Sequence, residues 1–355
     1  MTLRSHRFFV ICGLVRMAGN RYDRGCRNII ERERLSMKLV VLDGFTLNPG
    51  DLDWGVLGAF GPITVYPSTK DEEVVERIGD ADIVFVNKTR ITREMLAQCP
   101  NIRYIGELAT GFDNLDLEAI RERGIAVANV PDYGGIAVAQ HTMALLLELT
   151  NRTMWNHQHV VNGEWTGNTI PARGQWQMDM TELSGKTIGF VGFGTIAIYA
   201  ARMARAFGMR TLGYSRSERP EGREVAEYVD LDTLLRESDV VSLHMPLNDG
   251  SRNIMNRERF AKMKKGAFLV NTARGALVDE EALLEALDHG TLAGFATDVL
   301  VEEPFNMNHP LMGRDDVVLT PHIAWGPRAT RARLLQICAD NLQAFLDGKS
   351  LNRLV

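Results

Sequence analysis

The stretch Thr187-Ile-Gly-Phe-Val-Gly-Phe-Gly-Thr-Ile-Ala197 decides the fold of this chain. Its first five residues form the apolar run of a buried strand, and apolar side chains recur at helical spacing after it. The turn between them has the pattern G-x-G-x-x-A. Gly192 permits a tight turn, Gly194 lets the backbone approach a pyrophosphate, and Ala197 keeps the helix close to the strand. The stretch therefore predicts a dinucleotide-binding turn, because the amides at a helix start bind phosphate. Its expected contacts are Gly192, Phe193, Gly194, Thr195 and Ile196.

Strand-like and helix-like segments alternate on both sides of this stretch, from Lys38 to the end of the chain. Such alternation at βαβ spacing is typical of parallel α/β folds. We expect an α/β protein with two Rossmann-like, doubly wound parallel-sheet domains and the active site in the cleft between them. The expected strands are Lys38–Leu42, Ile63–Tyr66, Ile83–Val86, Tyr104–Gly106, Ile125–Ala128, Thr187–Val191, Arg210–Ser215, Val240–His244, Ala267–Asn271, Phe295–Asp298 and Val317–Thr320.

The pattern also predicts the domain boundaries. Residues 37–137 form the first, substrate-binding domain, which residues 326–355 complete after the turn at Gly326-Pro327. Residues 138–325 form the dinucleotide-binding domain. A long helical stretch, from Ile136 to about Val161, is suited to bridging the two domains.

Residues 1–36 differ from the rest of the chain. They contain eight arginines, no lysine and three acidic residues, a local charge of +5. The apolar run Phe8–Val15 is a weak signal-peptide pattern, and an arginine-rich transit peptide is a second reading. We favour an extension without a folded role, because Met37 stands directly before a clean strand.

Composition limits the classes of partner. The 355 residues allow two domains, and a net charge of -5 with a pI near 6.0 gives no reason to expect nucleic acid or an anionic membrane. No apolar run approaches the length of a transmembrane helix. The four cysteines lack metal-type spacing and fit a reducing compartment, so we expect no metal site and a cytoplasmic protein.

The second strand of the dinucleotide domain bears on cofactor choice. An NAD site usually has an acid about 20 residues past the glycines, and this chain has Ser215 and Arg216 there. Ser215 can donate a hydrogen bond and Arg216 can bind a 2′-phosphate, which favours NADP(H) modestly over NAD(H). Alternatively, Arg216 is a solvated loop residue.

Polar clusters follow three further strands, at the strand ends where open α/β sheets bind ligands. They contain Arg274, Glu303 and His322. Reduction of a 2-keto acid needs a cation for the carboxylate, an acid that protonates the oxygen, and a group that keeps the acid charged. Arg274 offers a bidentate fork, and histidine, the residue type at position 322, is the side chain whose unperturbed pKa lies near neutrality. Glu303, if it contacts the imidazole, would favour the charged ring.

From Lys38 to Val355 the sequence resembles the D-isomer-specific 2-hydroxyacid dehydrogenases. The resemblance is carried by the glycine turn, Asn271-Thr-Ala-Arg-Gly-Ala-Leu-Val-Asp279, Asp298-Val, Glu303-Pro304 and Thr320-Pro-His-Ile323. It implies that Arg274, Glu303 and His322 are the catalytic set. It also implies that Asp298 lies near the nicotinamide carboxamide. His244, Pro246, Thr272 and Ala273 match family segments that flank the cofactor.

The resemblance extends to the substrate. Ala109, Thr110 and Gly111 match a loop whose backbone amides bind the substrate carboxylate, and Lys88 is either a second carboxylate contact or a solvated lysine. We read His141 as structural. Trp325 resembles the glycerate dehydrogenase (hydroxypyruvate reductase) branch, which favours hydroxypyruvate or glyoxylate, although an aromatic residue can simply fill a domain interface. D-lactate-type, D-3-phosphoglycerate and branched 2-keto acid enzymes are the alternatives.

Two rival classes use the same fold. A corepressor-like NAD(H)-sensing protein would bind the cofactor without turnover, and no basic motif supports this reading. The second rival is a formate or phosphite dehydrogenase of the superfamily. Formate enzymes have an amide where Glu303 stands, so this carboxylate argues against formate oxidation. The resemblance further implies a homodimer formed through the cofactor domain, in which Asn162–Met180, with Trp165 and Trp176, is a candidate exchanged loop.

Overall fold

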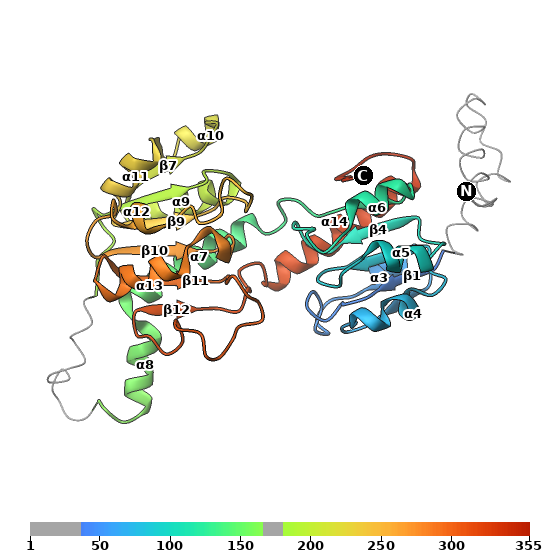
Figure 1. The fold of residues 1–355 in the computed structure, drawn as a ribbon, viewed down its shortest axis with the longest axis horizontal. Helices are drawn as coiled ribbons and strands as arrows, with labels where there is room; N and C mark the ends of the chain where they lie inside the picture. Colours follow the sequence, from blue (N-terminus) through green and yellow to red (C-terminus); the bar gives the residue numbers. More distant parts are fainter. Residues whose placement is uncertain (1–36, 166–179) are drawn as a thin grey trace. The chain divides into compact units, whose positions relative to one another are not determined.

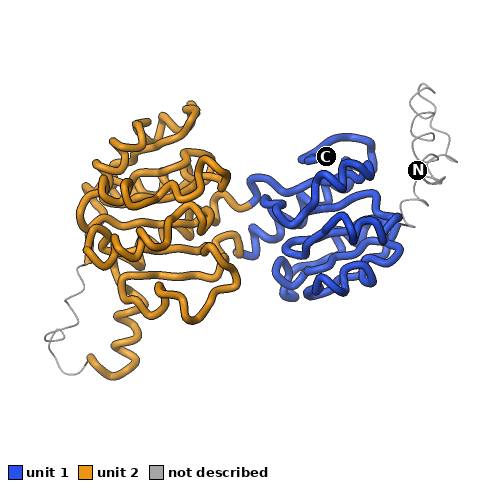
Figure 2. The backbone as a smooth tube through the Cα atoms, viewed as in Figure 1, with its two compact units in different colours: residues 1–133, 327–355 blue, residues 134–326 orange. Residues whose placement is uncertain are grey.

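The structure, a computed structural model of the chain, describes residues 37–165 and 180–355. The readings of residues 1–36, and most of the candidate exchanged loop, lie outside the described residues. The chain forms two compact units (Figure 2). Unit 1 is Met1–Tyr133 with Pro327–Val355, and unit 2 is Gly134–Gly326.

Unit 1 is built on a five-stranded parallel sheet in the order β2-β1-β3-β4-β5. Its strands are β1 (Leu39–Val41), β2 (Ile63–Val65), β3 (Ile83–Val86), β4 (Tyr104–Glu107) and β5 (Ala126–Ala128). Its helices are α3 (Gly55–Gly58), η1 (Asp71–Glu73), α4 (Val74–Ile78), α5 (Arg93–Gln98), α6 (Leu117–Glu122) and α14 (Arg328–Leu346) (Figure 1). The strand order reverses between β1 and β3, so the loops that follow these strands are the expected place for a ligand.

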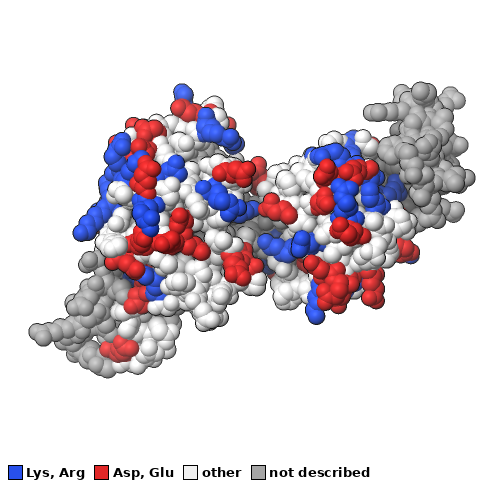
Figure 3. Space-filling view, in the orientation of Figure 1, with Lys and Arg blue, Asp and Glu red and all other residues white. Residues whose placement is uncertain are grey.

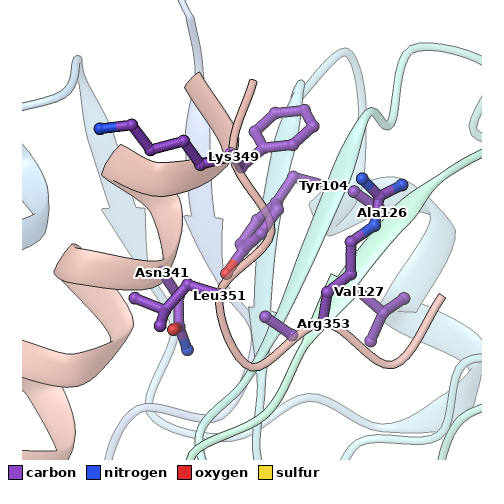
Figure 4. Close-up of a pocket in the computed structure, with 9 residues that line it drawn as sticks. Tyr104, Ala126, Val127, Asn341, Lys349, Leu351 and Arg353 are labelled. Carbon is purple, nitrogen blue, oxygen red and sulfur yellow. The ribbon is translucent and has the colours of Figure 1, made fainter. Parts of the chain in front are cut away.

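The end of the chain packs back on unit 1 after α14. Arg353 pairs with Ala128, and the Leu354 amide donates to the Val127 carbonyl. A shallow pocket lies between this segment, α14 and the sheet, and the Tyr104 side chain points into it (Figure 4). The Tyr104 hydroxyl is buried and has no hydrogen-bond partner among the described residues. It lies at the beginning of β4, opposite to the strand ends that bind ligands in this type of sheet.

Unit 2 is built on a seven-stranded parallel sheet in the order β12-β11-β10-β9-β6-β7-β8. Its strands are β6 (Thr187–Val191), β7 (Arg210–Tyr214), β8 (Glu227–Tyr228), β9 (Val240–Leu243), β10 (Ala267–Asn271), β11 (Leu292–Thr297) and β12 (Val317–Leu319). Between and around them lie α7 (Gly135–Asn151), α8 (Thr153–Val161), α9 (Thr195–Ala206), α10 (Pro220–Arg223), α11 (Leu231–Glu237), α12 (Arg257–Phe260), η2 (Gly275–Leu277) and α13 (Glu280–Asp288). The order reverses between β6 and β9, as in doubly wound dinucleotide-binding sheets.

Both faces of this sheet are covered, which explains its apolar strands. Consecutive residues of one strand, such as Leu269 and Val270, belong to different core clusters. One cluster includes side chains of α7 and α9, and the other includes side chains of α11, α12 and α13. Strands that are buried on both faces carry continuous hydrophobic runs, and those runs made the strands predictable.

The helical stretch predicted from Ile136 to about Val161 is helical but interrupted. The structure has two helices, α7 and α8, which meet at Arg152 in a left-handed conformation with φ 54°. The Glu148 carboxylate accepts hydrogen bonds from the Thr153 hydroxyl and from the Met154 amide (3.1 Å), and so begins the second helix. α7 buries nine of its residues, whereas α8 buries none. The break therefore falls where the chain leaves the core.

Charge is mixed on the visible surface. Acidic and basic side chains alternate over the face of each unit that Figure 3 displays. Within residues 37–165 and 180–355, no helix is long and apolar enough to cross a membrane.

Candidate active site

The glycine turn lies at the switch point of the unit 2 sheet. Gly192 has φ 92°, and a Cβ there would lie 2.7 Å from backbone atoms of His244 and Met245, so only glycine fits between the ends of β6 and β9. A Cβ on Gly194 would meet nothing within 4 Å. Gly194 leads directly into α9, which has no side-chain cap. An open backbone before an uncapped helix start fits a pyrophosphate.

The other residues of the glycine turn differ in their exposure. Thr195 and Ile196 are partly exposed at the start of α9. The Phe193 ring is buried and packs against the Phe190 and Tyr228 rings. Any contact between Phe193 and a cofactor would therefore come from its backbone.

Ser215 and Arg216 follow β7, the strand next to β6. The Ser215 hydroxyl donates to the Ser217 carbonyl (2.6 Å), and Arg216 is exposed. A further cation, which the sequence did not single out, lies beside the glycine turn: the Arg219 guanidinium donates to Thr195 Oγ1 (3.2 Å). This edge of the turn is thus positively charged.

His244 and Pro246 follow β9 across the switch point. Burial lowers the pKa of His244 to about 3, so the imidazole is neutral at physiological pH. The Ser242 hydroxyl is 2.8 Å from its Nε2. This pair holds a neutral ring next to the Gly192 turn, and Pro246 is exposed beyond it.

The segment that carries Arg274 is shaped by Asn271, the last residue of β10. The Asn271 side chain accepts from the Ala273 amide (3.0 Å) and donates to the Arg274 carbonyl (2.9 Å). Thr272 is held from α7 by a 3.0 Å contact with the Thr142 hydroxyl. The partly exposed Arg274 guanidinium donates to the Ala273 carbonyl (2.7 Å), and no ion pair of it occurs among the described residues. Its fork is therefore available to an anion.

Gly275 brings this segment against the loop that carries Glu303. A Cβ on Gly275 would lie 2.0 Å from the carbonyl carbon of Leu300. The Leu300 amide in turn donates to Glu303 Oε1 (3.0 Å). Only a glycine allows this approach, so the spacing of the two loops depends on it.

Glu303 and His322 are paired. Glu303 Oε2 lies 2.7 Å from His322 Nδ1, so Nδ1 carries the proton in this hydrogen bond and Nε2 faces away from it. The two side chains are 35% and 31% exposed, which leaves the imidazole accessible to a small molecule. This pair is the relationship that a histidine acid or base requires: a ring whose tautomer is set by a carboxylate.

Asp298 holds the turn that carries His322. One carboxylate oxygen accepts from the Thr320 hydroxyl (2.6 Å) and the Ile323 amide (2.9 Å), and the other accepts from the Ala324 amide (2.8 Å). Burial would raise the pKa of Asp298, but bonds from His141, Thr320 and the two amides together hold it below its usual value. His322 itself adopts a left-handed φ of 55°, which this network supports.

His141 and Trp325 complete the turn. His141 Nε2 lies 2.9 Å from Thr320 Oγ1, which already donates to Asp298, so the imidazole is the donor. The partly exposed Trp325 indole donates to the His322 carbonyl (2.9 Å). Both side chains therefore fix the position of the His322 segment.

The candidate substrate residues belong to unit 1. Lys88 is exposed in the loop after β3, and the Asp43 carboxylate accepts the amides of Asn87 (2.8 Å), Lys88 (2.5 Å) and Thr89 (2.7 Å). Ala109, Thr110 and Gly111 form the loop after β4. The Thr110 hydroxyl donates to the Val130 carbonyl (2.7 Å). Hydrogen bonds between a side chain and backbone groups therefore hold both loops.

The site can be compared with known proteins. The family model for the NAD-binding domain of the D-isomer-specific 2-hydroxyacid dehydrogenases matches residues 143–324, within unit 2. A hydroxypyruvate reductase of Blautia hydrogenotrophica is 44% identical over 320 residues, 89% of this chain and 99% of that protein. The chain belongs to this family.

A second relative and a solved structure are also similar to the chain. A glyoxylate reductase of Aeropyrum pernix is 42% identical to this dehydrogenase over 284 residues, 78% of the chain and 84% of that protein. The crystal structure of the TT0316 protein from Thermus thermophilus superposes with a TM-score of 0.79 at 35% identity. It covers 90% of this chain and 100% of that one. The predictions of the family, the two-sheet fold and an oxidoreductase are confirmed.

The dehydrogenase therefore uses a nicotinamide cofactor, which supplies or accepts a hydride when bound. The Gly192 turn, the open Gly194 and the uncapped start of α9 fit its pyrophosphate. Within the described residues, no group of three metal-ligating side chains is present.

Several supporting residues were missed by the sequence reading. Glu107 is the last residue of β4 and Asp43 lies two residues after β1, and this position near a strand end was the available signal. The partners of Asp298 and the position of Arg219 had no such signal, because they depend on contacts between segments that are separate in the sequence.

Proposed function

We propose that this dehydrogenase reduces hydroxypyruvate or glyoxylate to D-glycerate or glycolate and catalyses the reverse oxidation. The observation that carries the proposal is the hydrogen bond between His322 Nδ1 and Glu303 Oε2. It supports a proton carried at Nε2 for the carbonyl oxygen of a keto acid. The substrate class rests on the hydroxypyruvate reductase and glyoxylate reductase relatives.

The proposed division of work follows the chemistry of each side chain. His322 donates a proton from Nε2 to the carbonyl oxygen as the hydride arrives, and Glu303 keeps the ring oriented. Arg274 binds the carboxylate with two parallel hydrogen bonds and polarises the adjacent ketone. The backbone of Ala109, Thr110 and Gly111, with Lys88, binds the same carboxylate. Trp325 limits the pocket to small acids.

We propose the cofactor contacts on the same basis. Gly192, Phe193, Gly194, Thr195 and Ile196 bind the pyrophosphate through their backbone, and His244, Pro246, Thr272, Ala273 and Asp298 surround the nicotinamide half. NADPH is preferred because Ser215, Arg216 and Arg219 offer hydrogen bonds and positive charge where an NAD enzyme has an acid.

A homodimer formed through unit 2 is also proposed. α8 buries none of its own residues, and large apolar side chains on it and beside it are exposed. They are Met154, Val160, Val161, Trp165 and Met180. A second copy of this chain would cover them. The domain roles assigned to the two units, and a cytoplasmic location, also remain predictions.

The test is a panel of keto acids assayed with NADH and with NADPH. We expect the highest kcat/KM with hydroxypyruvate or glyoxylate and with NADPH. A highest value with pyruvate would support a D-lactate-type enzyme instead. Cofactor binding without turnover of any acid would support a corepressor-like sensor and overturn the proposal.

A further inference from the structure

Glu107 is a buried acid at the ligand-binding edge of unit 1. It is the last residue of β4, directly before the loop 109–111, and its side chain is 0% exposed. Its Oε1 has no hydrogen-bond partner among the described residues. Charged side chains are rarely buried without a partner, so Glu107 calls for an explanation.

The other oxygen of Glu107 is engaged by Asn114. Asn114 Nδ2 lies 3.1 Å from Glu107 Oε2 and 3.1 Å from the Thr89 carbonyl oxygen. One amide group therefore joins the end of β4 to the loop 87–89 that follows β3. Asn87 makes a second connection between the same two segments, because its Nδ2 donates to the carbonyl of Leu108, the residue after β4 (2.8 Å).

This network lies at the switch point of the sheet. Asp43, after β1, holds all three amides of the loop 87–89, and β1 and β3 are the strands between which the order reverses. The loops 87–89 and 109–111 are therefore joined below the surface that a ligand would meet. Their relative position depends on Asn114 and Asn87.

Glu107 is a neutral acid in this setting. Burial raises its pKa to about 9, and the hydrogen bond from Asn114 offsets only part of that effect. The surrounding charged or titratable groups are Asp43 after β1, Lys88 after β3, Asp113 after β4 and Cys338 on α14. A neutral carboxyl leaves Lys88 free of a competing buried anion and adds no negative charge beneath the loops.

We propose that Glu107 is a positioning residue for the keto acid, which acts through Asn114 to fix the loop 109–111 against the loop 87–89. The inference rests on the proposed function in one respect, that these loops bind the substrate carboxylate. If Glu107 ionises, its charge opposes Asp43 and Asp113 and repels an anionic substrate. Because a charge is costly to bury, the ionised side chain moves toward water and away from Asn114, the loops lose their fixed spacing, and the KM for the keto acid rises.

The decisive comparison uses an isosteric variant. Glu107→Gln retains an oxygen that accepts from Asn114 but has no titratable proton. We expect wild type and Glu107→Gln to have the same KM at pH 7. Above about pH 9, the KM of wild type should rise roughly tenfold more than that of the variant, the cost expected for a charge in a buried hydrogen-bond site. The KM for the cofactor should not separate the two proteins.

Asn114→Ala tests the connection without altering the acid. It removes both hydrogen bonds of Nδ2, and we expect a KM for the keto acid raised about tenfold at pH 7, with kcat reduced less. Glu118→Gln is the matched control for the chemical change, because Glu118 is an exposed carboxylate of the same unit. Tyr104→Phe is the control for a buried group at the opposite end of β4.

Amide hydrogen exchange of the loops 87–89 and 109–111 gives a readout that needs no turnover. At pH 7 we expect the loop amides to exchange faster in Asn114→Ala than in wild type. At high pH we expect them to exchange faster in wild type than in Glu107→Gln. Identical alkaline KM profiles for wild type and Glu107→Gln, or unchanged KM and exchange in Asn114→Ala, would overturn the proposal. Absence of keto acid turnover in wild type would instead contradict the proposed function, and the exchange data would still decide the role of Glu107.

Discussion

His322 Nδ1 and Glu303 Oε2 are 2.7 Å apart, and the other oxygen of Glu303 is held by the Leu300 amide. The carboxylate is therefore fixed before any substrate binds, and it fixes the imidazole in turn. Because Nδ1 is used, the proton that reaches a substrate must leave from Nε2. The Leu300 amide thus orients Glu303, and Glu303 orients His322, so a substitution of His322 tests its role directly.

Substitution of His322 should abolish most of the turnover. His322→Ala removes the proposed general acid, and we expect kcat to fall ~10²- to 10⁴-fold while cofactor affinity is kept. His289→Ala, at the exposed end of α13, is the matched control. Steady-state kinetics and a cofactor fluorescence titration measure the two effects. Near-normal kcat in His322→Ala would remove this residue from the mechanism.

Gly194→Ala separates cofactor binding from folding. Gly194 has an ordinary φ of -98°, and a Cβ added there would meet no protein atom within 4 Å. The free energy of unfolding of the variant should therefore lie within about 1 kcal/mol of the wild-type value. The added methyl group would occupy the space that the pyrophosphate needs, and we expect the KM for the cofactor to rise on the order of 10- to 100-fold. Calorimetry and kinetics together test this. A large loss of stability with an unchanged cofactor KM would contradict a phosphate-binding turn.

Asp298→Asn tests the support of the His322 turn. The carboxylate accepts from the Thr320 hydroxyl and from the Ile323 and Ala324 amides, whereas an amide would present donors to one of these backbone amides. We therefore expect a loss of about 1–3 kcal/mol of unfolding free energy and a lower kcat. The pKa of Asp298 is held below its usual value, so its ionised form stabilises the fold above the unfolded pKa, and this contribution disappears as pH falls through the folded pKa. The difference from wild type should therefore shrink in acid. Urea unfolding at neutral and acidic pH measures it, and a difference that persists undiminished would argue against the ionised form as the source.

The sequence predicted the parts of this dehydrogenase that depend on local pattern. Continuous apolar runs identified Thr187–Val191 and Ala267–Asn271 with their observed bounds, because strands buried on both faces need such runs. The two-residue β8 was missed because Glu227 and Tyr228 give no periodic signal. The break at Arg152 was missed because the Glu148 side chain caps the start of α8, a contact that depends on geometry and leaves no helix-breaking residue in the sequence.

In the candidate site, too, the residues marked by a local pattern were predictable. Strand ends and family motifs pointed to Arg274, Glu303 and His322, and the structure joins the last two directly. No pattern indicated that Glu107 would be fully buried, since Glu107 follows the predicted strand Tyr104–Gly106 and resembles a polar residue at a loop entrance. Its partners, Asn114 and the Thr89 carbonyl, come from different loops, and only the folded arrangement brings them together.

Cofactor choice should depend on Arg216. Arg216→Ala removes a cation from the end of β7, and we expect the KM for NADPH to rise about tenfold with little change for NADH. The exposure of Arg216 predicts that the effect weakens as salt rises. Arg223→Ala, which removes an exposed arginine paired with Glu218, is the control. A wild type that works better with NADH would make Arg216 a bystander and leave Ser215 alone to bind the ribose.

Glu107→Gln should stabilise the protein, and more so as pH rises. The pKa of Glu107 is raised by burial to about 9 from an ordinary value of 4.5, so between these values the folded state keeps a proton that the unfolded state releases. Folding stability therefore falls as pH increases through this window, by at most about 1.4 kcal/mol per pH unit, and levels off above the folded pKa. Glutamine has no such proton, so its advantage should grow from about pH 5 to about pH 9 in urea unfolding curves, with exposed Glu118→Gln showing none. Parallel stability profiles for wild type and Glu107→Gln would mean that Glu107 is already ionised at neutral pH, and the neutral acid beneath the loops would have to be abandoned.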